Sequence, residues 1–408
     1  MTDKLFEMAL GIGAPWYVAG TEFNAEARTL TIRVDFKAGT RFSVPGVSGE
    51  HPVYDTVSKR YRHLNFFQHE CFLEVRVPRI KLPDGAVRQI EPPWAGKLSG
   101  FTLLFEALVL MLCQQMPFAA AARLVGETRH RVAAICERYV ELTVAQTDLS
   151  GVRQIAIDET SRARGHDYIS LAADAVERRV LAVAEGRSIE TVETLTAELA
   201  ARGCMPDQVS SVSIDMSPAF IAGCGEAFPN AQITFDKFHV VWHASTAVDK
   251  MRRIEQRTER SLKGLRWSLL KDRSRLSGEA AADLDALIAR LTTVRTARAW
   301  LYKEQLREIL ERKQINVVRA MLEHWCTCVM RSKVEPMKEV AALVRKHLQG
   351  IVAWAQTRQT NGFLEALNGL FQAAKRRARG FTRMSTIKTV IFLIAGKLDF
   401  RVINPHAA

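Results

Sequence analysis

The stretch from residue 155 to residue 236 alternates short apolar segments with amphipathic ones, and it restricts the possible folds more than any other feature. Its apolar segments predict five strands, at 155–158, 168–175, 180–184, 209–214 and 231–235. Before the fourth strand, Val192, Leu195 and Leu199 recur at helical spacing, which predicts a helix over 188–201. Ser217-Pro218 is typical of a second helix start, because serine caps helices and proline is tolerated in the first turn.

Three strands, a helix, a strand, a helix and a strand is the order of a ribonuclease-H-like fold. Asp158 ends the first of these strands, and Asp215 and Asp236 directly follow the fourth and the fifth. Acids at strand ends lie at the rim of a sheet, where the active sites of α/β folds gather. A single aspartate there is more often a turn or cap residue. Two of them, together with Glu365 on the polar face of a later helix, indicate a site built from three carboxylates.

The helix that carries Glu365 is predicted at 361–379. Its apolar and polar side chains both recur with a period near 3.6 residues, so the helix is amphipathic, and Gly380 follows it as a cap. Residues 244–352, which precede it, are almost wholly helical in pattern and rich in Arg, Lys, Leu and Ala. From Met251 to Arg275 there are nine Lys or Arg residues against three Asp or Glu.

The N-terminal part predicts a β-rich unit followed by three helices. Residues 29–36 and 72–80 alternate apolar and polar side chains, as strands do, and this unit ends near Pro92-Pro93. Helices are then expected at 101–113, 118–125 and 128–143, with Gly126 breaking the second from the third. This plan matches a helix-turn-helix, although an ordinary three-helix bundle has the same pattern. The buried side of the third helix is expected to be Val132, Ile135, Cys136 and Tyr139.

The third helix opens with residues suited to DNA contact, which are Thr128, Arg129, His130 and Arg131. The chain as a whole carries a net charge of +13, with a pI of about 9.6. Such an excess favours a polyanionic partner, nucleic acid first and an anionic membrane second, although it also serves solubility. No run of 18 apolar residues predicts a membrane span.

The first residues do not resemble a signal peptide. The seven cysteines are scattered and odd in number, which favours reduced thiols over a disulfide framework. We therefore expect a cytoplasmic protein.

Three carboxylates suit one kind of chemistry in particular. Cleaving and rejoining phosphodiesters uses two divalent ions about 3.5–4 Å apart, one activating the attacking water or 3′ hydroxyl and one stabilising the leaving oxygen. Mg²⁺ prefers hard oxygen ligands. Asp158, Asp215 and Glu365 are therefore candidate ligands for two Mg²⁺ or Mn²⁺ ions.

Four ordered motifs carry a resemblance over nearly the whole chain. They are Ile157-Asp-Glu-Thr-Ser-x-x-x-Gly-His-x-Tyr168, Ile214-Asp-Met-Ser-Pro-x-Phe-Ile221, Phe228-Pro-Asn-Ala-x-Ile-x-Phe-Asp-Lys-Phe-His239 and Thr360-Asn-Gly-x-x-Glu-x-Leu-Asn368. Together they closely resemble the DDE transposases of bacterial insertion sequences, specifically the ISL-three family, and the basic stretch 375–381 fits as well. The resemblance implies a ribonuclease-H-like catalytic domain that is split by an all-helical insertion before the glutamate.

The resemblance implies that Asp158, Asp215 and Glu365 are the metal ligands. Asp236 and His239 resemble an accessory motif with a supporting role, but a strand-end aspartate and a core histidine would look the same. Either Asp215 or Asp236 could be the second ligand, and we favour Asp215 because it ends the fourth strand.

Side chains around Glu365 suit phosphate contacts, although a solvated basic face would look alike. These candidate DNA-binding residues are Asn361, Asn368, Lys375, Arg376, Arg377 and Arg379. Glu159 is expected to point away from Asp158 and to be structural, because neighbouring residues of a strand face opposite sides.

The chain departs from the family near its N-terminus. Relatives carry a zinc module there with paired cysteines, whereas the matching positions here are Val44, Val47, Leu82 and Gly85. These residues supply no donor for zinc, so we expect no structural zinc. Val44, Val47 and Leu82 are instead expected to form an apolar plug. His51, His63 and His69 are possible ligands, but their spacing fits no standard site.

The predicted domains are a β-rich zinc-ribbon-like unit without metal ligands (1–93), a helix-turn-helix (94–150), the first part of the catalytic core (151–243), a helical insertion (244–352) and the closing part with Glu365 (353–408). The predicted function is a DNA transposase, acting at least as a dimer on terminal inverted repeats and target DNA. The alternative is a catalytically inactive DNA-binding protein derived from a transposase, which the missing zinc ligands favour and the intact acids oppose. A third hypothesis, a structural scaffold with a nuclease fold, would require the three acids to be present by coincidence.

Overall fold

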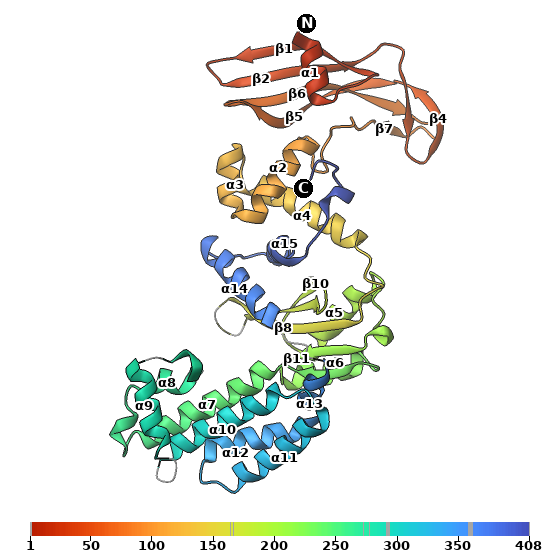
Figure 1. The fold of residues 1–408 in the computed structure, drawn as a ribbon. Coiled ribbons are helices and arrows are strands. Elements are labelled where there is room, and N and C mark those ends of the chain that lie inside the picture. The colour runs from red at the N-terminus through yellow and green to blue at the C-terminus, as the bar shows by residue number, and fades with distance from the viewer. Residues whose placement is uncertain are drawn as a thin grey trace. The chain divides into compact units, whose positions relative to one another are not determined.

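The computed structural model describes residues 2–163, 165, 167–271, 273–276, 278–290, 294–357 and 362–407 (Figure 1). The chain forms two compact units, Met1–Thr147 with Phe371–Ala408, and Asp148–Leu370. The division differs from the expected one at the C-terminus, because the residues from Phe371 onward fold with the N-terminal unit rather than with the catalytic core. Among the described residues, no helix is long and apolar enough to cross a membrane.

The second unit is built on a five-stranded mixed sheet in the order β10-β9-β8-β11-β12. Its strands are β8 (Gln154–Ala163), β9 (Asp167–Asp174), β10 (Arg179–Glu185), β11 (Ser211–Ile214) and β12 (Gln232–Phe235). β8, β9 and β10 form an antiparallel meander, whereas β11 runs parallel to both β8 and β12. The five predicted strands are thus all present, and the connecting segments form α5 (Ile189–Ala200), the short 3₁₀ helix η1 (Pro206–Gln208) and α6 (Pro218–Ala227).

One strand differs from its prediction in a way that matters for the site. β8 was expected to end at Asp158, but it continues to Ala163, because β9 pairs with it as far as Ala163. Only the pairing with β11 stops early, at Ala156. Asp158 therefore lies within β8, at the level where the neighbouring parallel strand ends.

The two faces of this sheet pack against different elements. Ile155 and Ile157 belong to the large apolar cluster that contains Val192 of α5 and Phe220 of α6. Ala156 faces the other way and packs with Ala173 of β9 and Leu364 of α14 (Gly362–Arg377). Asp158 is on the same face as Ala156, because side chains alternate along a strand. The helix with Glu365 thus packs on the face that carries Asp158.

The predicted insertion is helical. Its elements are α7 (Lys237–Glu255), η2 (Arg260–Leu262), α8 (Arg266–Leu270), η3 (Arg273–Arg275), α9 (Gly278–Ile288), α10 (Arg295–Glu311), α11 (Ile315–Met330), α12 (Glu335–Lys346) and α13 (Leu348–Thr357). α13 returns to the sheet and packs on β12, where Gly350 permits the approach. A Cβ atom on Gly350 would lie 2.4 Å from the ring of Phe235.

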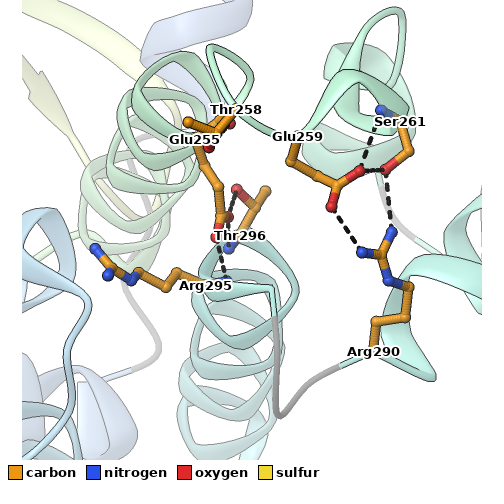
Figure 2. Close-up of polar contacts among 7 residues, drawn as sticks. All are labelled: Glu255, Thr258, Glu259, Ser261, Arg290, Arg295 and Thr296. Carbon is orange, nitrogen blue, oxygen red and sulfur yellow. Dashed lines mark hydrogen bonds and ion pairs between the residues drawn. The ribbon is translucent and has the colours of Figure 1, made fainter.

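Two acidic side chains join the ends of the insertion helices (Figure 2). Glu255, at the end of α7, accepts hydrogen bonds from the backbone N–H groups of Arg295 and Thr296 at 2.8 and 2.7 Å. It therefore caps α10 from a neighbouring helix, satisfying N–H groups that have no partner within α10. Glu259 pairs with Arg290 at 2.6 Å and accepts from the hydroxyl of Ser261 at 2.6 Å, and these bonds lower the pKa of Glu259 to about 2.

The first unit contains the N-terminal sheet, in the order β1-β2-β6-β5, with β7 on β6. Its elements are α1 (Thr2–Leu10), β1 (Trp16–Asn24), β2 (Thr29–Phe36), β3 (Arg41–Val44), β4 (Val47–Pro52), β5 (Asp55–Phe66), β6 (His69–Lys81) and β7 (Val87–Gln89). The two predicted strands are confirmed as β2 and β6. Val44 and Leu82 are buried in the apolar cluster of this sheet, and Val47 packs against it, as the apolar plug required. His63 is buried 2.9 Å from the hydroxyl of Thr102, and burial lowers its pKa to about 4.

Three helices follow the sheet, as predicted, and the chain's C-terminal residues complete their core. They are α2 (Leu103–Gln115), α3 (Phe118–Val125) and α4 (Arg129–Gln146). α15 (Met384–Ala395) packs against α4 and α2, and η4 (Phe400–Val402) packs against α4. The buried residues predicted for the third helix, Val132, Ile135, Cys136 and Tyr139, are all buried. Asn404, which is fully buried, donates to the hydroxyl of Tyr139 at 3.0 Å.

Candidate active site

Asp158 is a buried carboxyl held by two donors. Only 7% of the residue is exposed. Its Oδ1 accepts from the backbone N–H of Glu159 at 2.9 Å, and its Oδ2 accepts from the side-chain amide of Asn368 at 3.0 Å. Burial, followed by the charge of Glu159, raises its pKa to about 7, and the charge of Asp215 adds to the increase. An ionised Asp158 is therefore disfavoured unless a cation compensates its charge.

The parallel register places three aspartates in one row. Ser213 of β11 pairs with Ala156 of β8, so two residues further on Asp215 is level with Asp158. Ile214 pairs with Phe235 of β12, so Asp236 follows at the same level. Adjacent strands are about 4.8 Å apart. Asp215 is thus one strand away from Asp158, and Asp236 is two strands away.

Asp215 and Asp236 have different local roles. Asp215 is half-buried, and its Oδ1 accepts from the backbone N–H of Ser217 at 2.9 Å, just before α6. Ser217 occupies the predicted N-cap position without a capping bond from its own side chain. Asp236 is fully buried and caps α7, because its Oδ1 accepts from the backbone N–H of Phe238 at 2.9 Å. The charge of Asp215 acts on both Asp158 and Glu159.

Glu159 belongs to the same charged group, although the sequence indicated a structural residue. Its pKa is raised by burial first and by the charge of Asp215 second. Its Oε1 lies 3.7 Å from Arg187, whose guanidinium is 4.2 Å from the centre of the Tyr168 ring. Its Oε2 is buried and has no hydrogen-bond partner among the described residues. The two neighbouring acids Asp158 and Glu159 could have indicated that both belong to the site. The alternation of side chains along a strand predicted instead that they face opposite sides.

His239 lies in the first turn of α7, directly after the Asp236 cap. Its electrostatic interaction lowers the pKa of Asp158 and that of Glu159. Its Nε2 is buried without a hydrogen-bond partner in the described part of the chain. Asp236 therefore fixes the start of the helix that carries His239.

Glu365 is exposed and lies on α14, three residues before Asn368. Residues three apart share a helix face, and here they are separated by about 4.5 Å along the axis. Leu364 packs on Ala156, and Asn368 donates to Asp158. The face that carries Glu365 and Asn368 is consequently next to Asp158, over 200 residues away in the chain.

The candidate DNA-binding residues lie in different surroundings. Asn368, which is predicted to contact phosphate, donates its amide N–H to Asp158, and its Oδ1 is buried with no partner among the described residues. Asn361 lies outside the described residues. Arg376, Arg377 and Arg379 are exposed, and Lys375 is half-buried. On the third helix, the four predicted residues are exposed. Thr128 caps α4, and Arg131 pairs with Glu127 at 2.8 Å.

The donor set suits a hard divalent cation. The charges of Glu159 and Asp215 help to raise the pKa of Asp158, and the charge of Asp215 helps to raise the pKa of Glu159. Carboxylate and amide oxygens are the ligands that Mg²⁺ prefers. As arranged here, no three His, Cys, Asp or Glu side chains within the described ranges form a ready metal site. The residues therefore fit the ion chemically, and Glu365 would have to approach the aspartates to complete a site.

Comparisons with known proteins place the chain among the transposases. A family model described as a transposase, that of the ISL3 group, matches residues 155–391, and the helix-turn-helix domain of transposase family ISL3 matches residues 90–140. The chain belongs to the ISL3 family of transposases. It is 28% identical to the transposase for insertion sequence element IS1557 of Mycobacterium tuberculosis, with 96% of each chain covered. It is 26% identical to the transposase for insertion sequence element IS1001 of Bordetella parapertussis, with 81% of this chain and 82% of that one covered.

Proposed function

We propose that the chain binds the terminal inverted repeats of its insertion sequence and catalyses metal-dependent DNA cleavage and strand transfer. The strand order β10-β9-β8-β11-β12 supports a ribonuclease-H-like catalytic core. The observation that carries the proposal is the hydrogen bond from Asn368 to Asp158, because it sets the helix of Glu365 beside the aspartates. The enzyme would act on double-stranded DNA at the nucleoid, as a dimer at least, since two element ends must be paired.

On this proposal, Asp158, Asp215 and Glu365 hold two Mg²⁺ or Mn²⁺ ions. When bound, such ions activate the attacking water or 3′ hydroxyl and stabilise the leaving oxygen. Asp215 is favoured over Asp236 as the second ligand, because it is on the strand next to Asp158 while Asp236 is fully buried and caps α7.

The surrounding residues orient this set. Asn368 holds one oxygen of Asp158 and leaves its own amide oxygen available. Arg187 partly offsets the charge of Glu159, and His239 does the same for both neighbouring acids. Arg129 and His130, both exposed at the start of α4, are placed to contact base edges or phosphates of the repeat.

The test is a cleavage assay on a duplex that carries the terminal repeat of the element, with Mg²⁺ or Mn²⁺. We expect metal-dependent nicking by the native chain, its loss in Glu365→Gln, and its retention in the control Glu335→Gln, which removes an exposed acid from α12. Repeat binding without nicking by the native chain would instead support a catalytically inactive DNA-binding protein. Equal nicking by Glu365→Gln would exclude Glu365 as a ligand.

A further inference from the structure

The turn between β5 and β6 exposes two phenylalanines. Phe66 pairs with His69 across the hairpin, so Phe67 and Gln68 form a two-residue connection. Phe67 is 82% exposed and Phe66 is 41% exposed, with their ring centres 5.0 Å apart. Aromatic rings contribute to folding mainly through burial. Phe67 makes almost no such contribution.

The backbone at Phe67 makes the residue more unusual. Its φ is +52°, in the left-handed region that bulky side chains avoid. The first position of a two-residue hairpin connection with positive φ favours Gly, Asn or Asp. Phenylalanine is thus disfavoured here by local conformation and gains nothing from burial. Residues held against their preference in this way collect at functional sites.

A buried arginine anchors this hairpin to the helix-turn-helix. Arg62 of β5 is only 3% exposed, and its guanidinium donates to the carbonyl oxygen of Val125 at 3.3 Å, at the end of α3. The same group donates to the side chain of Asn65 at 2.6 Å and to the carbonyl oxygen of Cys71 at 3.2 Å. The hairpin is therefore fixed to the turn that precedes α4.

The backbone at that turn favours glycine. Gly126 follows Val125 with a φ of +71°, and a Cβ atom there would lie 2.7 Å from the carboxylate of Glu70 on β6. α4 begins three residues later, at Arg129. From Arg62 the strand extends for about 13 Å to Phe66, comparable with the roughly 12 Å width of the DNA major groove. The phenylalanines are thus about one groove width from the anchor on the helix-turn-helix.

We propose that the β5–β6 turn is a second DNA-contacting element, in which Phe67 inserts between base pairs beside the site contacted by α4 and Phe66 supports it. The inference rests on the proposed function in that α4 must bind DNA. Apolar side chains that enter a base step partly unstack it and kink the duplex. Such contacts tolerate many sequences, because every base has an aromatic face. α4 would then read the repeat while the turn deforms the DNA next to it.

The experiment uses the full chain and a duplex that carries the terminal repeat of the element, with 2-aminopurine placed at successive positions. With the native chain, we expect fluorescence to rise at one step beside the region protected by α4. Phe67→Gly should remove that rise and weaken binding about 5- to 50-fold. Its thermal unfolding midpoint should be unchanged or higher, because glycine adopts a φ of +52° without strain.

Two further variants separate the contribution of Phe67 to DNA binding from that of other exposed aromatic rings and from that of α4. Tyr54→Ala removes a 59% exposed aromatic ring from the same unit, just before β5, and should bind like the native chain. Arg129→Ala should weaken binding but leave the fluorescent step in place, because the turn still inserts there.

Three results would overturn the proposal. If Phe67→Gly keeps both the affinity and the fluorescence signal, the turn does not contact DNA, although binding through α4 would stand. If Phe67→Gly changes only the dissociation of a dimer in analytical ultracentrifugation, the turn is a contact between copies. If the native chain fails to bind the repeat at all, the proposed function fails together with this inference.

Discussion

Two buried carboxyls, one in each unit, have opposite environments. Glu106, which is fully buried on α2, accepts from the N–H groups of Lys97 and Leu98 at 2.7 and 2.8 Å and from the hydroxyl of Tyr139 at 2.7 Å. Asp158 is almost as deeply buried and has two donors, but Glu159 and Asp215 add like charges beside it.

The difference shows that burial of an acid does not by itself distinguish a structural role from a functional one. The pKa of Glu106 is raised by burial, and its three hydrogen bonds oppose that increase. The pKa of Asp158 is raised by burial and raised further by its neighbours. A buried acid whose donors satisfy it stabilises the fold, whereas a buried acid next to other acids stores repulsion that a cation can relieve. Glu106 is thus structural, and Asp158 is poised for function.

The largest expected effect comes from Asp158→Asn. It should lower the rate of repeat cleavage at least about 10³-fold, because the change removes the charge of a proposed metal ligand without removing bulk. The measurement is single-turnover nicking in saturating Mg²⁺. The matched change Glu106→Gln, assayed below its unfolding temperature, should leave the rate within a few-fold of native. Similar losses in both variants would abolish the distinction between the two acids.

The second prediction concerns the pH dependence of stability without metal. In the unfolded chain Asp158 ionises near pH 4, whereas in the folded chain its pKa is about 7. Between these values the folded state holds the extra proton, so the free energy of unfolding falls as pH rises from about 4 to 7. The free energy of unfolding of Asp158→Asn should therefore exceed that of the native chain by roughly 2–4 kcal/mol at pH 8 and by little at pH 4.

Urea unfolding at both pH values, in EDTA, measures this effect. Added Mg²⁺ should raise the free energy of unfolding of the native chain at pH 8 and remove much of the difference from Asp158→Asn. A native chain as stable as Asp158→Asn at pH 8 would contradict the raised pKa of Asp158.

The third prediction is a loss of stability in Glu106→Gln. The new amide replaces one carboxylate oxygen with an NH₂ donor, so the buried N–H group of either Lys97 or Leu98 loses its acceptor. We expect the free energy of unfolding to fall by about 2–3 kcal/mol. Chemical denaturation of the full chain provides the measurement, and an unchanged midpoint would show that the carboxylate is not needed there.

The smallest effects should separate two asparagines. Asn404 donates to the carbonyl oxygen of Leu103 and to Tyr139, so Asn404→Ala should cost about 1–2 kcal/mol of stability and leave cleavage unchanged once folded. Asn368→Ala should change stability less but slow cleavage about tenfold, because Asp158 loses the group that orients it. Parallel melting and nicking assays compare the two, and a reversed pattern would reject these roles.

Much of the local structure was predictable from the sequence. Apolar periodicity located the strands around Asp158 and Asp215 and the buried side of α4, because it depends on residues only a few positions apart. The ends of elements were less predictable. β8 extends beyond Asp158 because β9 pairs with it, and no residue near Asp158 encodes that pairing.

The sequence by itself determined which side chains are available for chemistry: Asp158, Asp215 and Glu365, each placed by local pattern on a strand or helix, and the helix-turn-helix that precedes them. Only the tertiary structure decided how they are used. It turned Asn368 towards Asp158, brought Glu159 into the charged group, and folded the residues after Phe371 with the N-terminal unit. The physical reason is the distance along the chain over which each effect operates. Periodicity depends on residues a few positions apart, whereas hydrogen bonds and burial that involve residues far apart in the sequence are set by packing.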